Sequence, residues 1–137
     1  MGVVFMNGKR NFNWKAFEEP KKKFMGVEQI AILDHGGMSF NVTFMRNNFP
    51  EEKPKFVKFF HDEDSDNKYI GFQFTDDDKI TGVHKVYYPK KEYGIVACVS
   101  FFKKYNIDYK NKHKGPHRPE IIQDKDAGKL YVISVRK

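Results

Sequence analysis

The fold is decided by the stretch Gly37-Met38-Ser39-Phe40-Asn41-Val42-Thr43-Phe44-Met45-Arg46-Asn47-Asn48-Phe49. Met38 and Phe40 alternate with a polar residue, which is typical of a strand with one buried face. The next residue, Asn41, is a good helix N-cap because its side-chain oxygen can accept from the amides of a first helical turn. The stretch therefore predicts a strand followed by a short helix that ends near Asn47-Asn48, before Pro50.

The flanking residues predict two hairpins around this stretch. Val27–Leu33 reads as a strand, and the turn Asp34-His35-Gly36-Gly37 would reverse it into Met38 and Phe40. Downstream, residues 56–60 and 69–74 are β-rich, and the polar linker 61–68 between them favours a second hairpin. Within 69–74 the apolar residues follow a two-residue period, at Ile70, Phe72 and Phe74. A further strand is predicted over 83–88.

The pattern appears a second time from Gly94 onwards. Residues 95–99 predict a strand, Ser100 is a candidate N-cap, and Phe101, Phe102 and Tyr105 would lie on the buried side of a short helix. Residues 109–119 then form a basic connection with Gly115, Pro116 and Pro119, which we expect to be exposed. A last hairpin from Pro119 to Val135 would turn at residues 124–128.

Length and composition favour one small domain of the β-rich α+β class. The chain has 137 residues, of which 16% are aromatic, so a core is available. We expect an N-terminal basic arm over residues 1–25 and one barrel-like domain over 26–137, made of two related units at about 27–88 and 94–136. No apolar run approaches the roughly 20 residues of a membrane-spanning helix, and residues 1–6 are too short for a signal-peptide core. With Cys98 as the single cysteine, the sequence predicts a cytoplasmic protein.

Each predicted unit has a Gly-led strand, a Ser or Asn position, a short helix and a hairpin with an acidic turn. This layout, over about Val27 to Val135, resembles the swapped-hairpin barrels of the AbrB, MazE and MraZ type. The resemblance implies a bacterial DNA-binding module, a transcription regulator in which two such units interleave their strands, here within one chain. The layout is also similar to that of small uncharacterised bacterial proteins, which implies no activity.

The chain departs from the first loop typical of that family, Gly-Arg-apolar-Thr-apolar-Pro. Here residues 36–41 read Gly-Gly-Met-Ser-Phe-Asn, without the Arg or the Pro. The Arg expected near the helix middle falls at Met45, with Arg46 one place further on. The second unit has only Lys103 and Lys104 as cations between Gly94 and Ile107. Architecture depends on apolar spacing, whereas phosphate contact depends on particular cations, so these departures affect DNA binding more than the fold.

The charge is unevenly spread along the chain, which has a formal net charge of +7. Basic residues dominate 1–25 and 102–118, whereas 51–79 carries nine acids against five lysines. Basic segments of this kind can contact phosphates. We therefore predict non-enzymatic nucleic-acid binding. The predicted contacts are Lys21, Lys22, Lys23, Lys103, Lys104, Lys110, Lys112, Lys114 and Arg118.

Two alternatives stay open. The acidic centre and basic ends can instead serve a protein-interaction module that binds a protein partner or another copy of the chain. Aromatic residues interleave with the cations, and any exposed ring among Phe101, Phe102, Tyr105 and Tyr109 could stack on an unpaired base. The simpler interpretation, which the spacing favours, makes Phe101, Phe102 and Tyr105 the buried stripe of the helix.

The sequence offers little for catalysis, and we predict no enzyme, cofactor or metal. Residues 62–67 resemble the start of a calcium loop, but the acid expected at the twelfth place is Gln73, inside a predicted strand. His113 and His117 have a spacing seen in zinc sites, without the paired cysteines that would complete four ligands. Cys98 lies in an apolar run that predicts burial as an inert thiol.

Overall fold

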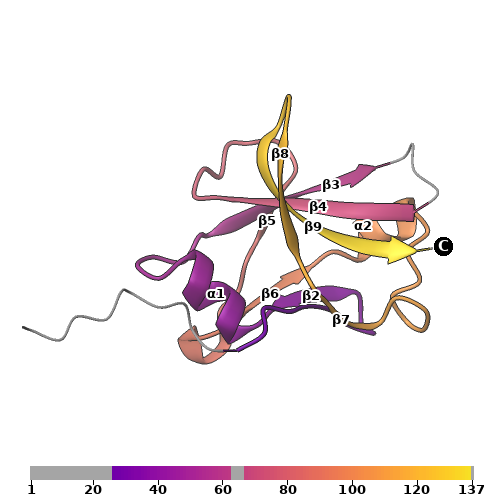
Figure 1. The fold of residues 1–137 in the computed structure, drawn as a ribbon, viewed down its shortest axis with the longest axis horizontal. Coiled ribbons are helices and arrows are strands. Elements are labelled where there is room, and N and C mark those ends of the chain that lie inside the picture. Colours follow the sequence, from indigo (N-terminus) through magenta and orange to yellow (C-terminus); the bar gives the residue numbers. More distant parts are fainter. Residues whose placement is uncertain (1–25, 63–66, 137) are drawn as a thin grey trace, which may run out of the picture.

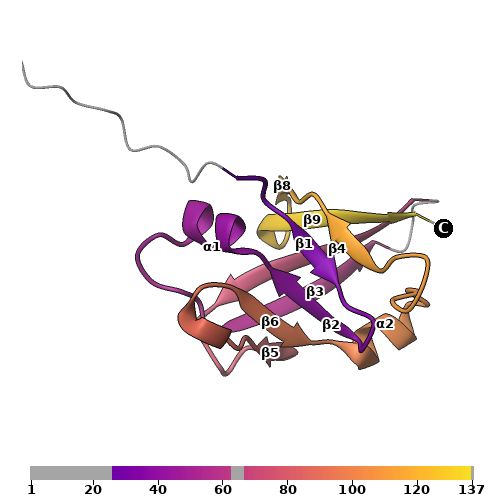
Figure 2. The same ribbon diagram turned by 90° about the horizontal axis from the view of Figure 1, so that it is seen from below.

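Two antiparallel β-sheets face each other, and two short helices lie at opposite ends of the molecule (Figures 1 and 2). The structure is a computed structural model that describes residues 26–62 and 67–136. The predicted β-rich α+β class is confirmed. The predicted arm, residues 1–25, lies outside the described residues.

The four-stranded sheet has the order β6 (Gly94–Ala97), β2 (Gly37–Phe40), β1 (Ile30–Ile32) and β7 (Gly115–His117). The predicted hairpin of β1 and β2 is confirmed, with Ile30 opposite Phe40, although β1 is shorter than the predicted Val27–Leu33. Gly36 closes its turn at φ +92°, a backbone conformation that glycine adopts without steric cost. Strand β2 then pairs antiparallel with β6, so the strands that begin at Gly37 and Gly94 lie side by side.

The five-stranded sheet has the order β5 (Val83–Lys85), β3 (Phe56–Asp62), β4 (Asn67–Thr75), β9 (Gly128–Arg136) and β8 (Glu120–Asp124). Both predicted hairpins, β3–β4 and β8–β9, are confirmed, and β4 pairs antiparallel with β9 to join them. As the two-residue period predicted, Ile70 and Phe72 are fully buried. The predicted strand over 83–88 ends at Lys85.

The expected barrel is not closed. On one side the chain passes between the sheets, because the Val86 N–H donates to the carbonyl of Lys55, just before β3, and Tyr87 then forms a bridge with Ile95 of the other sheet. On the other side β7 and β8 are the outer strands of their sheets and do not pair with each other. The short connection 118–119 links them. A 3-10 turn, η1 (Pro89–Lys91), precedes β6.

Helix α1 (Val42–Asn48) begins and ends where the sequence predicts. The side chain of Asn41 accepts from the Phe44 N–H at 2.9 Å, which confirms the predicted N-cap. The sequence predicted Val42, Met45 and Phe49 as the apolar positions of this helix, but the residues that are buried are Thr43, Phe44 and Met45. Phe44 is fully buried and packs edge-on against Tyr131 at 5.0 Å between ring centroids.

Helix α2 (Val99–Lys104) corrects two predictions. Val99 begins the helix rather than ending the strand, and the N-cap is Cys98 instead of Ser100, which lies in the first turn. Cys98 makes no side-chain capping bond. The helix is held by its apolar side, since Phe102 is fully buried.

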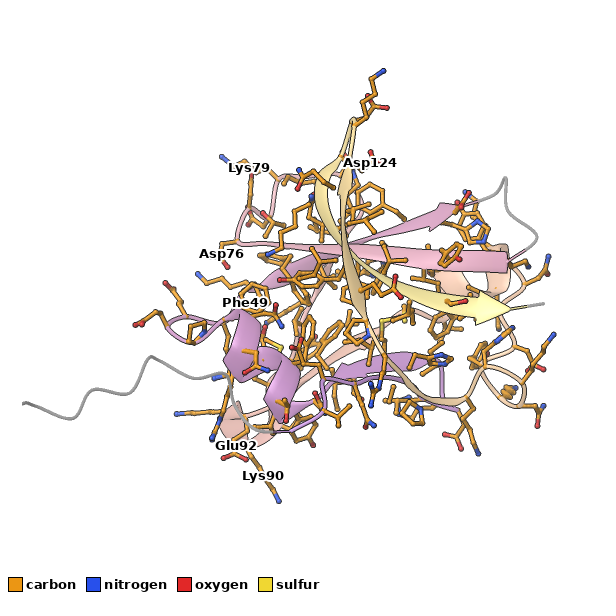
Figure 3. The ribbon with its side chains drawn as sticks, viewed as in Figure 1. Phe49, Asp76, Lys79, Lys90, Glu92 and Asp124 are labelled. Carbon is orange, nitrogen blue, oxygen red and sulfur yellow. The ribbon has the colours of Figure 1, made fainter. Side chains whose placement is uncertain are left out.

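The core lies between the two sheets, where the side chains in Figure 3 are densest. Each sheet contributes one face, and each helix contributes one fully buried phenylalanine. The largest fully buried side chains are Phe40, Phe44, Phe72, Phe102, Ile30, Ile32, Met38, Met45, Ile70 and Ile133. Neither helix of the described residues has the length and apolar character needed to cross a lipid bilayer.

Candidate nucleic-acid interface

Six of the predicted nucleic-acid contacts lie on one continuous segment that runs from α2 through the following connection and past β7. We call residues 103–118 the basic segment. All six side chains are exposed: Lys103, Lys104, Lys110, Lys112, Lys114 and Arg118. The other three predicted contacts, Lys21, Lys22 and Lys23, lie outside the described residues.

Residues 109–119 are largely exposed, as the sequence predicts, but the basic segment is anchored to the core at three positions. Ile107, Tyr109 and His113 are each less than 10% exposed. The Ile107 N–H donates to Phe102 at 2.9 Å, and the ring of Tyr109 stacks on Phe102 at 5.4 Å between centroids. Buried anchors thus alternate with exposed cations, and each anchor holds the backbone from which the neighbouring lysines project.

Backbone geometry and strand pairing fix the course of the segment. Asn106 has φ +55°, a left-handed conformation that asparagine tolerates better than most residues. The Asp108 carbonyl accepts from the His113 N–H at 2.8 Å, and the Asp108 carboxylate accepts from the Asn111 N–H at 3.2 Å. The segment then enters β7, which pairs with β1. The cations are therefore presented from a defined backbone.

A small pocket of about 340 Å³ opens between the basic segment and β9, lined by Lys112, His113, His117 and Ser134. The Nε2–H of His117 donates to the backbone carbonyl of His113 at 2.8 Å, so this nitrogen is occupied within the protein. Burial and then the nearby charges of Lys112 and His117 lower the pKa of His113. An ammonium group and a hydroxyl at one pocket suit an anion.

The two histidines do not form part of a metal site of the usual composition. Among the residues that the structure describes, no three His, Cys, Asp or Glu side chains gather closely enough to hold a metal. Of the calcium-loop residues, 63–66 lie outside the described part of the chain. Gln73 lies in β4, where its amide donates to the carbonyls of Ala127 and Lys129 at 2.8 and 3.0 Å. Its contacts join the two hairpins.

A second pocket, of about 450 Å³, lies where α2 meets β3 and β5. We call it the ring pocket because most of its walls are aromatic. Its rings pack against one another across elements, with Phe59 and Phe101 at 5.2 Å and His61 and Tyr105 stacked at 4.1 Å between centroids. The lining residues are Phe59, Phe60, His61, Gly82, His84, Ser100, Phe101, Lys104 and Tyr105.

The ring pocket divides the aromatic residues of α2 into two groups. Phe102 is fully buried, as the simpler sequence interpretation predicted, whereas Phe101 and Tyr105 are half-buried and line the pocket. Phe59, His61 and His84 were not among the site residues that the sequence predicted. The two-residue spacing of Phe59 and His61 was the available signal, because it places both on the inner face of β3.

Cys98 is buried at 1% exposure, which confirms the predicted burial. Burial raises the pKa of its thiol to about 12. The thiolate, which is the nucleophilic form of cysteine, is therefore rare at neutral pH.

The outer face of the five-stranded sheet carries a groove of about 660 Å³. Gly71 leaves its floor open, and Phe60, Leu130 and Val132 supply apolar surface. The carboxylates in its lining are Asp62, Glu120 and Asp124, and no lysine or arginine of the described residues lines it. Figure 3 places Asp124 beside the β8–β9 turn, where its carboxylate accepts from the Asp126 and Ala127 N–H groups. These two bonds lower the pKa of Asp124.

Comparisons of the chain with models of protein families, with curated proteins and with solved structures found no match.

Proposed function

We propose that the protein is a non-enzymatic nucleic-acid-binding protein whose phosphate contacts are made by the basic segment. The observation that carries this proposal is the anchoring of six exposed cations on one segment by buried Ile107, Tyr109 and His113. Side chains on a fixed backbone lose less conformational freedom on binding than those on an unstructured one. The segment contains one acid, Asp108, whose carboxylate is engaged with the backbone.

The test is binding of labelled single-stranded and duplex DNA over a salt series from about 50 to 200 mM. Six phosphate contacts predict a loss of affinity of roughly a thousandfold across this range. A Lys110→Ala, Lys112→Ala, Lys114→Ala variant should make the slope of log affinity against log salt shallower by about 2.7 for duplex DNA, since each contact contributes about 0.9.

A matched control removes the same charge elsewhere. Lys79, Lys85 and Lys125 are exposed and lie outside the basic segment. Figure 3 shows Lys79 at the end of the molecule away from α2. The corresponding triple alanine variant should keep the wild-type slope. Equal effects of the two triple variants would mean that net charge alone drives binding, and no binding at 50 mM salt would end the proposal.

We further propose that the chain contains two related units, β2-α1-β3-β4 and β6-α2-β8-β9, as in the AbrB-like regulators that the sequence resembles. Support comes from the pairing of corresponding strands: β2 with β6, and β4 with β9, both antiparallel. Antiparallel pairing of equivalent strands is what a local two-fold axis requires. Sequence-specific regulation of transcription and a cytoplasmic location remain predictions.

A second candidate is self-association through the acidic groove. Its specific support is the set of three carboxylates on an apolar surface, which complements the basic segment of another copy. The test is sedimentation at about 50 and 200 mM salt with Glu120→Lys and, as a control, Glu52→Lys, both at exposed positions. A low-salt dimer lost only in Glu120→Lys would support this candidate. A monomer in all conditions would exclude it.

A further inference from the structure

The ring pocket has the composition of a site for a flat, uncharged or anionic ligand. Its volume of about 450 Å³ falls within the roughly 300–1,000 Å³ of small-molecule sites. Rings from three elements supply flat apolar surface, while Ser100 and Lys104 supply polar groups. No carboxylate of the described residues lines the pocket, which disfavours an amine ligand. A nucleobase, with a π-face and a polar edge, meets each of these conditions.

Position links the ring pocket to the basic segment. Lys104 belongs to both, and Lys103 precedes it at the exposed end of α2. Lys68 lies on the same side, where its ammonium donates to the Tyr105 carbonyl at 2.9 Å. A base in the pocket would therefore bring its own phosphates to lysines that are already present.

A base can stack on Tyr105 by replacing the weaker contact between the Lys104 ammonium and the Tyr105 ring. One face of Tyr105 is covered by His61, and the Lys104 ammonium lies 5.4 Å from the ring centroid. An exposed cation–π contact contributes about 0.5–1 kcal/mol, whereas a stacked base contributes about 1–3 kcal/mol. Because the Lys104 side chain is exposed and flexible, it can move to a phosphate and leave the ring to the base.

The polar edge of the pocket suits a base as well. Burial lowers the pKa of His84, so its imidazole is neutral at pH 7 and offers one donor and one acceptor nitrogen. The Ser100 hydroxyl can donate or accept. Bases in a duplex are paired and stacked on their neighbours, so they cannot enter such a pocket without unstacking.

We propose that the ring pocket holds one unpaired base of a single-stranded nucleic acid, whose adjacent phosphates lie on Lys103, Lys104 and Lys68. This inference rests on the proposed function and makes it more specific, because it predicts a preference for single strands. The basic segment supplies phosphate contacts to any nucleic acid, and the ring pocket supplies the discrimination.

The test compares a labelled 12-nucleotide oligothymidine with a random-sequence duplex at about 50 mM salt, using the full chain. Wild type should bind the single strand more tightly. Tyr105→Leu removes the flat ring and should weaken single-strand binding by roughly 5- to 150-fold, the loss of one stacked base, with duplex binding unchanged. Tyr87→Leu is the control, because Tyr87 is 57% exposed beneath Lys85 and lies outside the pocket.

A second variant keeps the test valid if Tyr105→Leu does not fold. Ser100 is exposed at the pocket mouth, one helical turn from Lys104, so Ser100→Leu should obstruct the pocket without removing a ring. Unaltered single-strand affinity in folded Ser100→Leu and Tyr105→Leu would overturn the pocket while the salt response of the basic segment could still stand. Absence of binding to either DNA would instead remove the proposed function and this inference together.

Discussion

Replacing Asn41 by alanine should destabilise the protein by more than the loss of a helix cap. The Asn41 side chain accepts from the N–H groups of Phe44 at 2.9 Å and Gln29 at 3.1 Å, and it donates to the Val27 carbonyl at 2.8 Å. It therefore ties α1 to the chain that leads into β1. Loss of the cap costs about 1 kcal/mol. Each of the other two bonds contributes about 0.5–1.5 kcal/mol, with the lower value for the exposed Val27 contact.

The expected loss for Asn41→Ala is about 2–3 kcal/mol in the free energy of unfolding. Equilibrium denaturation in guanidinium chloride, followed by circular dichroism, measures it as a lower midpoint with an unchanged slope. Asn41→Asp is the control: it keeps both acceptor roles and adds a negative charge at a helix N-terminus, but it sets a carboxylate oxygen against the Val27 carbonyl, so its loss should be smaller than that of Asn41→Ala without being zero. Equal losses in the two variants, or a loss below about 0.5 kcal/mol in Asn41→Ala, would refute this account of the side chain.

Three further perturbations follow from the structure. Gly36→Ala should cost about 2–5 kcal/mol, because it combines a positive φ with a β-carbon only 2.1 Å from a methyl carbon at the start of α2. Gly82→Ala, at φ +83° with nothing within 4 Å, should cost only the strain of about 1–2 kcal/mol, and denaturation curves that fail to separate the two variants would contradict this. The thiol of Cys98, with its pKa raised to about 12, should resist iodoacetamide at pH 8 in the folded protein and react on unfolding, as mass spectrometry can follow. Burial lowers the pKa of His84 and His113, so below about pH 6.5 the unfolded chain binds more protons than the folded protein. The free energy of unfolding should therefore be highest above about pH 6.5 with respect to these two groups. Below that pH it should fall by at most about 1.4 kcal/mol per pH unit for each histidine. His84→Gln and His113→Gln should flatten the pH dependence of the denaturation midpoint, and an unchanged dependence in both would contradict it.

Local signals in the sequence predicted the elements whose cause is local. The β3–β4 hairpin follows from two β-rich runs around a polar turn, the second with a two-residue period, and the start of α1 follows from one side chain, Asn41. Strand β7 was missed because Gly115-Pro116-His117 has no strand signature, and it forms by pairing with β1 more than 80 positions away. The start of α2 was misplaced because a buried Phe102, rather than a capping side chain, holds that helix.

The candidate site also combines features with a local cause, which the sequence predicted, and features that depend on distant residues, which it did not. The cations of the basic segment could be predicted from the sequence because the charge of a lysine or arginine follows from the residue type alone. The buried anchors of the segment could not be predicted, because no local pattern around Tyr109 indicates that its ring stacks on Phe102. The ring pocket combines β3, β5 and α2, and only the packing of the two sheets brings those distant residues together.

The open side of the sandwich has a consequence for handling the protein. On this side of the described structure, the outer strands of the two sheets are β7 and β8, which are close in sequence and are not equally protected. Pro116 removes a backbone donor from β7, whereas β8 has Ile121 at 57% and Ile122 at 41% exposure beside an edge that pairs with no strand of the described residues. An accessible apolar edge strand is a template for intermolecular pairing. We therefore expect β8 to be the first site of intermolecular pairing as the concentration rises, and Ile121→Lys should reduce that association.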